Sequence, residues 1–468
     1  MDSIPIQQAT SRSWDVVVAG SSFASMFFVY ALPTTLDVLI IEKGRIRDHQ
    51  DLLRNGEEPP EPIAQTNTSP FPKQWTATTL FGGNSNCWWA QTPRFHPDDF
   101  ATKARFGIGQ DWLLSYDALE PFYLEAEAIM EVAGGGSEHI LKRSQPFPFP
   151  PHAPSRSDLA LRAMSSAWFA APTARSNGGR RFRCCASGVC RRCPVDSKFT
   201  IVNSLDQFER PGVSLLLNAE VRALQIEAGT ARAAVVRHGG AEHEIRGDLF
   251  GLGANAIFNS AIMLRSGLTA PALGRYIHEQ LSRRAIIDVA IPNYFGGTSI
   301  TGHGYHFYHS APRDQFAAVM IENFNAPVAL RPLRGRWTER LNLNFIAEDI
   351  PREDNRVVLD SNGEPHVFWN GHSKYAELGL ERALASVAKI LPAPIENLTV
   401  DAYTSTQNHI QGTTRMGKDL ADGVVDRGLK CHEVRNVLAL GAGAFPSCSP
   451  ANPTLTLSAL SLHAARSL

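Results

Sequence analysis

Apolar runs and polar turns alternate along the first part of the chain. Residues 14–19, "WDVVVA", form a β-branched run that ends at Gly20, and residues 36–44, "LDVLIIEKG", contain a second such run. Between them, residues 21–32 carry apolar side chains at helical spacing. Short continuous apolar runs are typical of strands buried on both faces of a parallel sheet. The pattern therefore predicts a strand–helix–strand unit whose two strands are parallel.

A similar strand-to-helix pattern closes the chain. Residues 436–446 contain an apolar run followed by glycines, and residues 452–468 return to helical spacing. Between the two ends, residues 213–238 predict short antiparallel strands with a turn. Residues 248–267 predict a strand, a turn and a helix. The two ends of the chain are therefore expected to contribute to one sheet.

The middle of the chain is richer in strands than in helices. Residues 285–370 are strand-like and include a hairpin pattern with a turn at Asn362-Gly363. The Pro- and Phe-rich residues 144–155 predict an extended linker. This order of elements predicts an α/β fold, in which a Rossmann-type domain is assembled from separated segments and a strand-rich domain is inserted.

The composition is that of an ordinary globular protein. The chain has 468 residues, of which 43% are hydrophobic and 19% charged, with a formal net charge of -1. It is long enough for two or three domains, and its charge gives no sign of nucleic-acid binding or of attraction to a membrane surface. The N-terminus lacks a secretion signal, and no apolar run is long enough to span a membrane. We therefore expect a cytoplasmic protein, or a periplasmic one if a partner subunit exports it.

The first strand–helix turn carries only part of a dinucleotide-binding fingerprint. The stretch Gly20-Ser21-Ser22-Phe23-Ala24-Ser25 stands where G-x-G-x-x-G is expected, and only its first glycine is present. The helix N-terminus still offers N–H groups to phosphate. Glu42 follows the second strand, where a carboxylate binds ribose hydroxyls. Taken alone, this motif leaves open an α/β unit that binds no nucleotide.

Three further segments change this interpretation. They are "FGGNSNCWWAQTPRFHPDDF" (81–100), "NHIQGTTRMG" (408–417) and "LGAGAFPSCSPANPTLT" (440–456). Together with the first turn, they resemble the glucose–methanol–choline (GMC) oxidoreductase family of flavoenzymes. Within that family, pyranose 2-oxidase and the FAD-dependent glucose dehydrogenases are the most alike. The resemblance runs from Asp15 to the C-terminus, and the middle of the chain matches only loosely.

The resemblance implies a division of the chain into two domains. The FAD-binding domain is expected to be discontinuous and to consist of residues 10–100, 180–280 and 400–468. Residues 101–179 and 281–399 are expected to form a substrate or cap domain of the α+β type, built on an antiparallel sheet.

The resemblance also implies the residues that hold FAD. They come from the first turn, the Gly-Gly loop, a strand of the middle segment and the last strand end. Pyranose 2-oxidase binds its flavin covalently through a histidine at the position of Cys87. We therefore expect non-covalent FAD, with a cysteinyl–flavin bond as the alternative. The implied contacts are Gly20, Ser21, Ser22, Phe23, Ala24, Glu42, Lys43, Gly82, Gly83, Asn84, Asn86, Cys87, Trp88, Trp89, Val221, Gly441, Ala442, Pro453 and Thr454.

Two residues match the family's catalytic pair. His409 matches the base that removes the hydroxyl proton, and Asn452 matches the residue that faces it. Histidine suits this role because its pKa lies near the operating pH, and asparagine can donate a hydrogen bond to the substrate oxygen. The implied reaction is oxidation of an alcohol group of a sugar, glycoside or sugar-derived metabolite, with hydride transfer to flavin N5.

Three histidines of the inserted region stand at three-residue spacing, namely His303, His306 and His309. They are either substrate contacts or exposed strand residues. On a strand, residues three apart point to opposite faces, so this spacing does not favour a metal site.

Four cysteines lie close together at Cys184, Cys185, Cys190 and Cys193, followed by Pro194. Thiolates suit an iron–sulfur cluster or zinc, although zinc sites usually separate their cysteine pairs by more residues. Adjacent cysteines rarely form a disulfide. The glucose dehydrogenases of the family have a similar loop that holds a three-iron cluster. The resemblance therefore implies the first three cysteines as ligands, with the fourth nearby or as a further ligand.

Such a cluster would pass electrons on to an acceptor protein or a small partner subunit. Two rival functions remain at this point. One is a sugar or alcohol oxidase that uses oxygen as its acceptor. The other is a flavin- or metal-binding subunit without turnover, which the incomplete glycine fingerprint favours.

Overall fold

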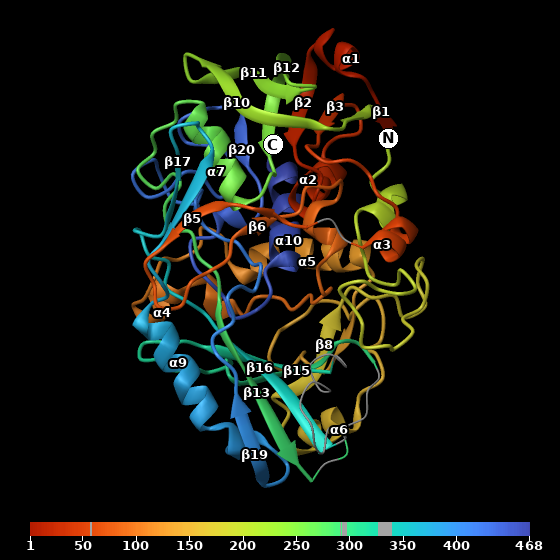
Figure 1. Ribbon diagram of the computed structural model, residues 1–468, viewed down its shortest axis with the longest axis vertical. Helices are drawn as coiled ribbons and strands as arrows, with labels where there is room; N and C mark the ends of the chain where they lie inside the picture. The colour runs from red at the N-terminus through yellow and green to blue at the C-terminus, as the bar shows by residue number, and fades with distance from the viewer. Residues whose placement is uncertain (57–58, 291, 293–296, 326–338) are drawn as a thin grey trace.

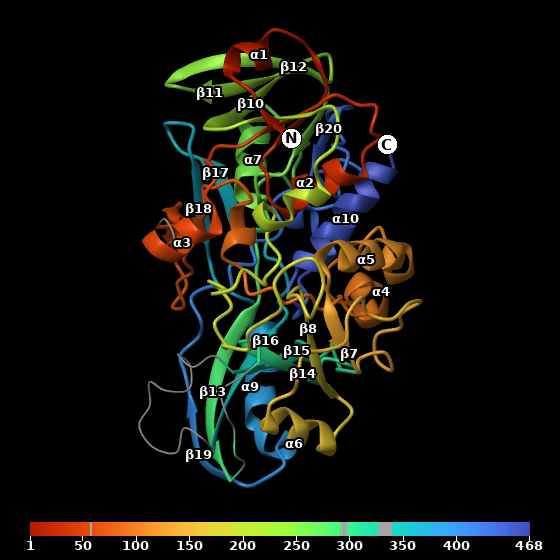
Figure 2. The same cartoon turned by 90° about the vertical axis from the view of Figure 1, so that its right-hand side faces the viewer.

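The computed structural model describes residues 1–56, 59–290, 292, 297–325 and 339–468. The molecule is elongated, and its two large sheets lie at opposite ends (Figures 1 and 2). Both termini lie at the end that carries the parallel sheet. None of the described helices combines the length and the apolar character needed to cross a membrane.

The first sheet has a parallel core built from separated parts of the chain. Its order is β1-β9-β3-β2-β12, and β20 pairs with β12 as well. All these pairings are parallel, which confirms the predicted Rossmann-type arrangement. The strands are β1 (Asp2–Ser3), β2 (Trp14–Ala19), β3 (Val38–Ile41), β9 (Val213–Leu216), β12 (Ala241–Leu252) and β20 (Val437–Ala439).

One prediction for residues 213–238 is wrong. Its second and third strands, β10 (Ala219–Glu227) and β11 (Thr230–His238), are antiparallel and extend the sheet beyond β12, as predicted. Its first strand, β9, was predicted to be antiparallel but pairs with β3 in parallel. The physical reason is burial: "VSLL" is a short apolar run, as is typical of a strand inside a parallel sheet.

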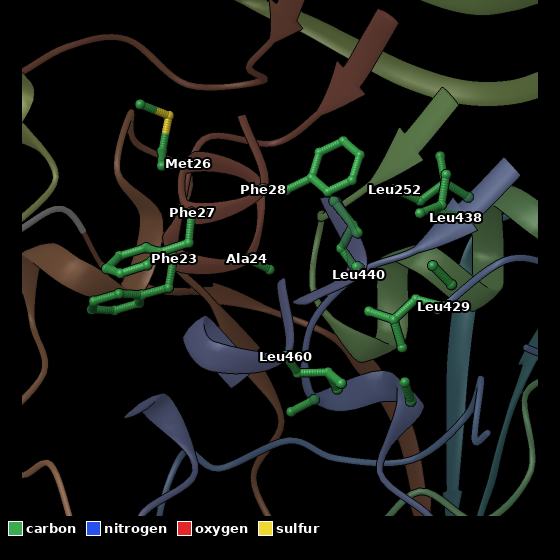
Figure 3. Packing of buried hydrophobic residues seen from close by; sticks show 14 of the residues in the cluster. Phe23, Ala24, Met26, Phe27, Phe28, Leu252, Leu429, Leu438, Leu440 and Leu460 are labelled. Atoms are coloured by element: carbon green, nitrogen blue, oxygen red, sulfur yellow. The ribbon is translucent and has the colours of Figure 1, made fainter. Parts of the chain in front are cut away.

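Helices cover the parallel strands. The first, α2 (Phe23–Ala31), is buried along almost its whole length. Its side chains lie beside those of the strand ends Leu252, Leu438 and Leu440 (Figure 3). Two others, α7 (Ala256–Arg265) and α10 (Thr454–Arg466), complete this core. The longest helix, α5 (Tyr116–Met130), also joins it, because the Tyr123 hydroxyl and Thr456 Oγ1 are 2.8 Å apart.

The second sheet is antiparallel and has the order β19-β13-β16-β15-β14-β8-β7. Side chains at alternate positions of β13, β15 and β16 pack against α9 (Lys374–Ala385), so the other face is turned away from that helix. This sheet confirms the strand-rich inserted part. Its strands are β7 (Ala133–Gly135), β8 (Trp168–Thr173), β13 (Leu281–Val289), β14 (Ile300–Phe307), β15 (Val319–Phe324), β16 (Arg340–Ala347) and β19 (Ile395–Val400).

A small three-stranded sheet contains the predicted hairpin. The hairpin strands β17 (Arg356–Leu359) and β18 (Pro365–Trp369) flank a turn in which Gly363 has a φ of +74°. The other elements are α1 (Ile6–Thr10), α3 (His49–Asn55), α4 (Thr102–Phe106), α6 (Arg156–Met164), β4 (Glu61–Pro62), β5 (Ala64–Asn67), β6 (Thr76–Ala77) and the 3₁₀ helices η1 (Gly83–Asn86), η2 (Pro97–Phe100), η3 (Val202–Gln207), η5 (Val387–Ile390) and η6 (Ala442–Ala444).

Candidate active site

Three of the segments expected to bind FAD are joined by hydrogen bonds. The Ser21 hydroxyl donates to Glu42 Oε2 (2.5 Å), and the Gly82 N–H donates to Ser21 Oγ (2.9 Å). The other oxygen of Glu42 accepts from the Gly44 N–H (2.7 Å). Burial raises the pKa of Glu42, although these hydrogen bonds oppose the shift. The first turn, the end of β3 and the Gly-Gly loop therefore meet at one place.

The glycines around this place are packed too closely against neighbouring atoms to be replaced by residues with side chains. Gly20 has a φ of +86°, and a Cβ there would lie 2.7 Å from the Gly253 carbonyl oxygen. A Cβ on Gly83 would lie 3.0 Å from Ser22 Cβ, and one on Gly441 would lie 3.1 Å from Ala24 Cβ. The last strand end thus also reaches the first turn, which is the arrangement that a closely approached flat ligand needs.

The structure explains the missing third glycine of the fingerprint. Ser25 takes its place on α2, and its hydroxyl donates to the Ala19 carbonyl (3.2 Å). A Cβ on Gly253 would lie only 2.0 Å from Ser25 Oγ. The glycine that allows helix and strand to approach is therefore Gly253, at the end of β12, rather than residue 25. Ser22, the N-cap of α2, makes no side-chain capping bond within the described part of the chain.

The Gly-Gly loop closes into η1 and leads toward the second sheet. The Asn86 amide donates to the carbonyls of Phe81 and Gly83, and the Asn84 carbonyl accepts from Cys87 N–H (3.2 Å). The Trp88 ring lies 4.7 Å from that of Phe23. The next ring, that of Trp89, lies 5.2 Å from Phe324 on β15.

The remaining expected cofactor residues are spread around this centre. Lys43 forms an ion pair with Glu61 (3.0 Å), and Val221 lies at a bulge of β10. The Ala442 carbonyl accepts from the Gly412 N–H (3.1 Å), and Pro453 and Thr454 begin α10. That these residues contact FAD stays a prediction.

The loops that carry the two expected catalytic residues are joined by Gln280, which the sequence analysis missed. Gln280 Oε1 lies 3.1 Å from His409 Nδ1. The amide nitrogen of Gln280 donates to the carbonyls of Ser449 (2.8 Å) and Ala451 (3.0 Å), directly before Asn452. Gln280 therefore connects the loop of the histidine with the loop of the asparagine. Its signal in the sequence is weak: a polar Glu-Gln pair directly before an apolar strand.

These contacts determine which ring nitrogen of His409 carries the hydrogen atom. Because the Gln280 amide nitrogen faces two carbonyls, its oxygen faces His409. The Nδ1 atom must then carry the hydrogen, and Nε2 carries the lone pair. Burial lowers the pKa of His409 to about 4, while Glu279 acts in the opposite direction. The imidazole is therefore neutral near pH 7 and can accept a proton at Nε2.

Replacing Gln280 with glutamate tests this arrangement. A carboxylate beside Nδ1 would stabilise the imidazolium and raise the pKa of His409 by roughly one to three units. The acidic limb of the kcat/KM profile should then move upward from about pH 4 by that amount. Gln8→Glu, at an exposed position of α1, adds the same charge elsewhere and should leave the profile unchanged. An unshifted profile for Q280E would contradict the assigned contact.

A buried ion pair supports the loop that carries His409. Lys73 Nζ lies 2.7 Å from Glu279 Oε1, and both side chains are buried. The other oxygen of Glu279 accepts from Thr406 Oγ1 (3.2 Å) and from the N–H groups of Gln407 (3.1 Å) and His409 (3.3 Å). Burial alone would raise the pKa of Glu279, but Lys73 lowers it below its ordinary value. This pair is the second positioning element that the sequence analysis missed.

The thiols of the four clustered cysteines differ in their burial and in their contacts. Cys190 Sγ accepts from the Ser299 N–H (3.0 Å), and Cys193 Sγ accepts from the Ser197 N–H (3.2 Å). Cys184 is half-buried, burial raises its pKa, and Cys185 is exposed. Within the described ranges, no three His, Cys, Asp or Glu side chains are grouped so that they could hold a metal ion.

A cavity of about 560 Å³ separates the cysteine loop from α3. Its lining includes Cys193 on one side, His49 on the other and Asn86 of the Gly-Gly loop. The cysteine loop is therefore a neighbour of a segment that was expected to bind the cofactor.

Comparisons with known proteins show similarity to oxidoreductases of the GMC type. Residues 351–461 match the C-terminal model of the GMC oxidoreductases. The chain is 25% identical to the fructose dehydrogenase large subunit of Gluconobacter japonicus, over 97% of both chains. It is also 25% identical to the 6'''-hydroxyparomomycin C oxidase of Streptomyces lividus, over 98% of this chain and 91% of the relative. The crystal structure of pyridoxine 4-oxidase from Mesorbium loti is similar, with a TM-score of 0.72 and 18% identity, over 97% of this chain and 99% of that chain.

Proposed function

Since this chain is an oxidoreductase of the GMC type, we propose that it oxidises an alcohol group of a sugar, glycoside or sugar-derived metabolite, with FAD as its cofactor. The observation that carries the proposal is the contact of Gln280 with His409 and with the loop before Asn452. It joins a neutral base to the loop that carries a hydrogen-bond donor, and a base and a donor are the groups that alcohol oxidation needs.

The residues around the first turn fit FAD. The uncapped N-terminus of α2 suits the pyrophosphate, and Glu42 stands where ribose hydroxyls bind. Gly83 and Gly441 let the Gly-Gly loop and the last strand end approach Ser22 and Ala24 of the first turn, where the flavin is expected. When bound, FAD supplies the acceptor for the hydride that leaves the alcohol carbon. We propose non-covalent binding, with Cys87 as a packed thiol whose Sγ lies 3.7 Å from Thr78 Oγ1.

The chain's own residues then act on the hydroxyl group. His409 Nε2 takes the hydroxyl proton while Gln280 keeps Nδ1 protonated and the ring in place. Asn452 donates a hydrogen bond to the substrate oxygen as charge develops on it. The ion pair of Lys73 and Glu279 holds the histidine loop at its backbone. The proton thus stays on the protein when the alcohol becomes a carbonyl.

The electron acceptor is a separate part of the proposal. The similarity to a protein named as a large subunit supports a partner subunit as the acceptor. The described part of the structure shows no group of metal ligands, so the expected three-iron cluster at Cys184, Cys185 and Cys190 rests on the resemblance alone and stays a prediction. No electron-transfer step is therefore assigned to these thiols.

An anaerobic absorbance spectrum of the purified protein tests the function. We expect a flavin spectrum that bleaches with members of a panel of sugars and glycosides, and acid precipitation should release the flavin. Slow peroxide formation with oxygen as sole acceptor would favour the dehydrogenase, and rapid formation would favour the oxidase. Iron and acid-labile sulfide in the same sample would support the cluster. A flavin that no sugar or alcohol bleaches would contradict the proposed function.

A further inference from the structure

Four polar side chains form a continuous row across the antiparallel sheet. Arg284 of β13 pairs with Asn344 of β16, Asn344 pairs with Glu322 of β15, and Glu322 pairs with His303 of β14. Direct cross-strand partners point to the same face of a sheet. Their neighbours along β13, β15 and β16 pack against α9, so the row lies on the opposite face.

This face is turned toward the catalytic asparagine. Asn452 lies close enough to Glu322 to hydrogen-bond with it and lower its pKa, against the larger effect of burial, which raises it. The Asn344 amide donates to Glu322 Oε2 (3.0 Å), and the charge of Arg284 also acts on this carboxyl group. The row is therefore continuous with the active site rather than a separate polar cluster.

Several polar atoms of the row have no partner. His303 is 0% exposed, and neither of its ring nitrogens has a hydrogen-bond partner in the described part of the structure. The same is true of Glu322 Oε1, of Asn344 Oδ1 and of Asn452 Oδ1. Folded proteins satisfy nearly all such buried groups, and exceptions call for an explanation. The simplest explanation is a ligand whose polar groups form the missing hydrogen bonds.

The polar groups of the row restrict which chemical groups the ligand must carry. Burial lowers the pKa of His303 to about 3, so its ring is neutral near pH 7 and offers one donor and one acceptor. Glu322 Oε1 offers an acceptor. A hydroxyl group both donates and accepts, so a pair of neighbouring hydroxyls matches His303 and Glu322. Because Arg284 stands in the same row as Glu322, the row does not require a cationic ligand.

We propose that the row of Arg284, Asn344, Glu322 and His303 binds the hydroxyl groups of a neutral glycoside, and that Glu322 and His303 select it over simple alcohols. This inference rests on the proposed function, since it names the substrate class of that site. The row covers three inter-strand steps, roughly 14 Å at the usual strand spacing. That length accommodates more than one sugar ring, which favours a glycoside over a free monosaccharide.

Substitution of the two selecting residues tests the proposal. We would compare Glu322→Leu and His303→Leu with the FAD-loaded wild type, using methyl glycosides, methyl 2-amino-2-deoxyglycosides and cyclohexanol. Each variant should lower kcat/KM for the glycoside roughly 10- to 100-fold, because a hydroxyl loses its partner. The value for cyclohexanol, which has no further hydroxyl group for the row to bind, should fall less than the value for the glycoside. A purely structural role would lower both values together, so their ratio is the decisive readout.

Ile321→Val is the matched control, because Ile321 lies on β15 beside Glu322 but packs in the cluster with α9. It should leave the ratio unchanged. Flavin absorbance and thermal melting check that each variant is folded. If a leucine variant fails to fold, Glu322→Met and His303→Phe replace it. Both remove the polar partner at similar side-chain volume, and the same fall in the glycoside-to-cyclohexanol ratio is expected.

The outcomes separate this inference from the proposed function. An unchanged ratio in the variants, or a wild type that prefers amino sugars or cyclohexanol, would overturn the inference while alcohol oxidation stands. If no compound bleaches the flavin, the proposed function fails. Calorimetric titration of the same methyl glycosides then still decides the inference: binding that weakens in both leucine variants supports it, and equal or absent binding overturns it.

Discussion

His409→Ala should leave FAD bound and slow substrate-dependent flavin bleaching by a factor on the order of 10² to 10⁴, the usual contribution of a general base. The reason is that Nε2 of His409 is the proton acceptor, with Nδ1 held by Gln280. Among the described residues, the His409 side chain is hydrogen-bonded to Gln280 and not to the segments around Gly20, Glu42 and Gly83, so the cofactor should stay. Anaerobic stopped-flow absorbance measures the rate, and the spectrum before mixing measures the bound flavin.

A second histidine provides the control for this variant. His432 Nε2 lies 3.0 Å from the Gly417 carbonyl, in a turn that the proposed reaction does not use. His432→Ala should therefore keep the wild-type bleaching rate. If H409A bleached as fast as H432A, the base would have to be another group. If H409A lost its flavin, the loop would be a structural part of the cofactor site.

The elements that the sequence predicted best are those with strong local patterns. The buried runs of β2 and β3 and the hairpin of β17 and β18 carry their signals within a few residues. The direction of β9 was predicted wrongly: its short apolar run favours a parallel sheet, but the strand's direction is fixed by its neighbour. That neighbour, β3, lies far away in the sequence.

The residues of the candidate site differ in the same way: some stand in local sequence motifs and others do not. His409 and Asn452 stand in segments with recognisable local motifs, so the resemblance was enough to name them. Gln280 meets its partners across 169 and 171 residues of chain, and no local pattern encodes such contacts. His303 was expected to be either a substrate contact or an exposed strand residue, and its burial corrects the second alternative. Its role as a substrate contact stays a prediction.

Lys73→Met should destabilise the protein by about 3 to 5 kcal/mol, since it leaves the carboxylate of Glu279 buried without its counter-charge. Both side chains of this pair are almost fully buried, so solvent offers little compensation. The double variant K73M/E279Q removes both charges and keeps an oxygen that can accept from the loop of His409. It should regain most of the lost stability. Lys389→Met, at an exposed position of η5, controls for the loss of one positive charge.

The pH dependence of the stability lost in K73M shows whether Lys73 acts through its charge or through packing. Lys73 lowers the pKa of Glu279 in the folded protein, so the pair's contribution is present above the unfolded pKa and is lost as the pH falls through the folded one. In K73M the carboxyl group is instead expected to be protonated on folding. The stability gap to the wild type should therefore narrow between about pH 7 and about pH 4. Urea unfolding at several pH values measures it, and a gap that stays constant would show that Lys73 acts through packing alone.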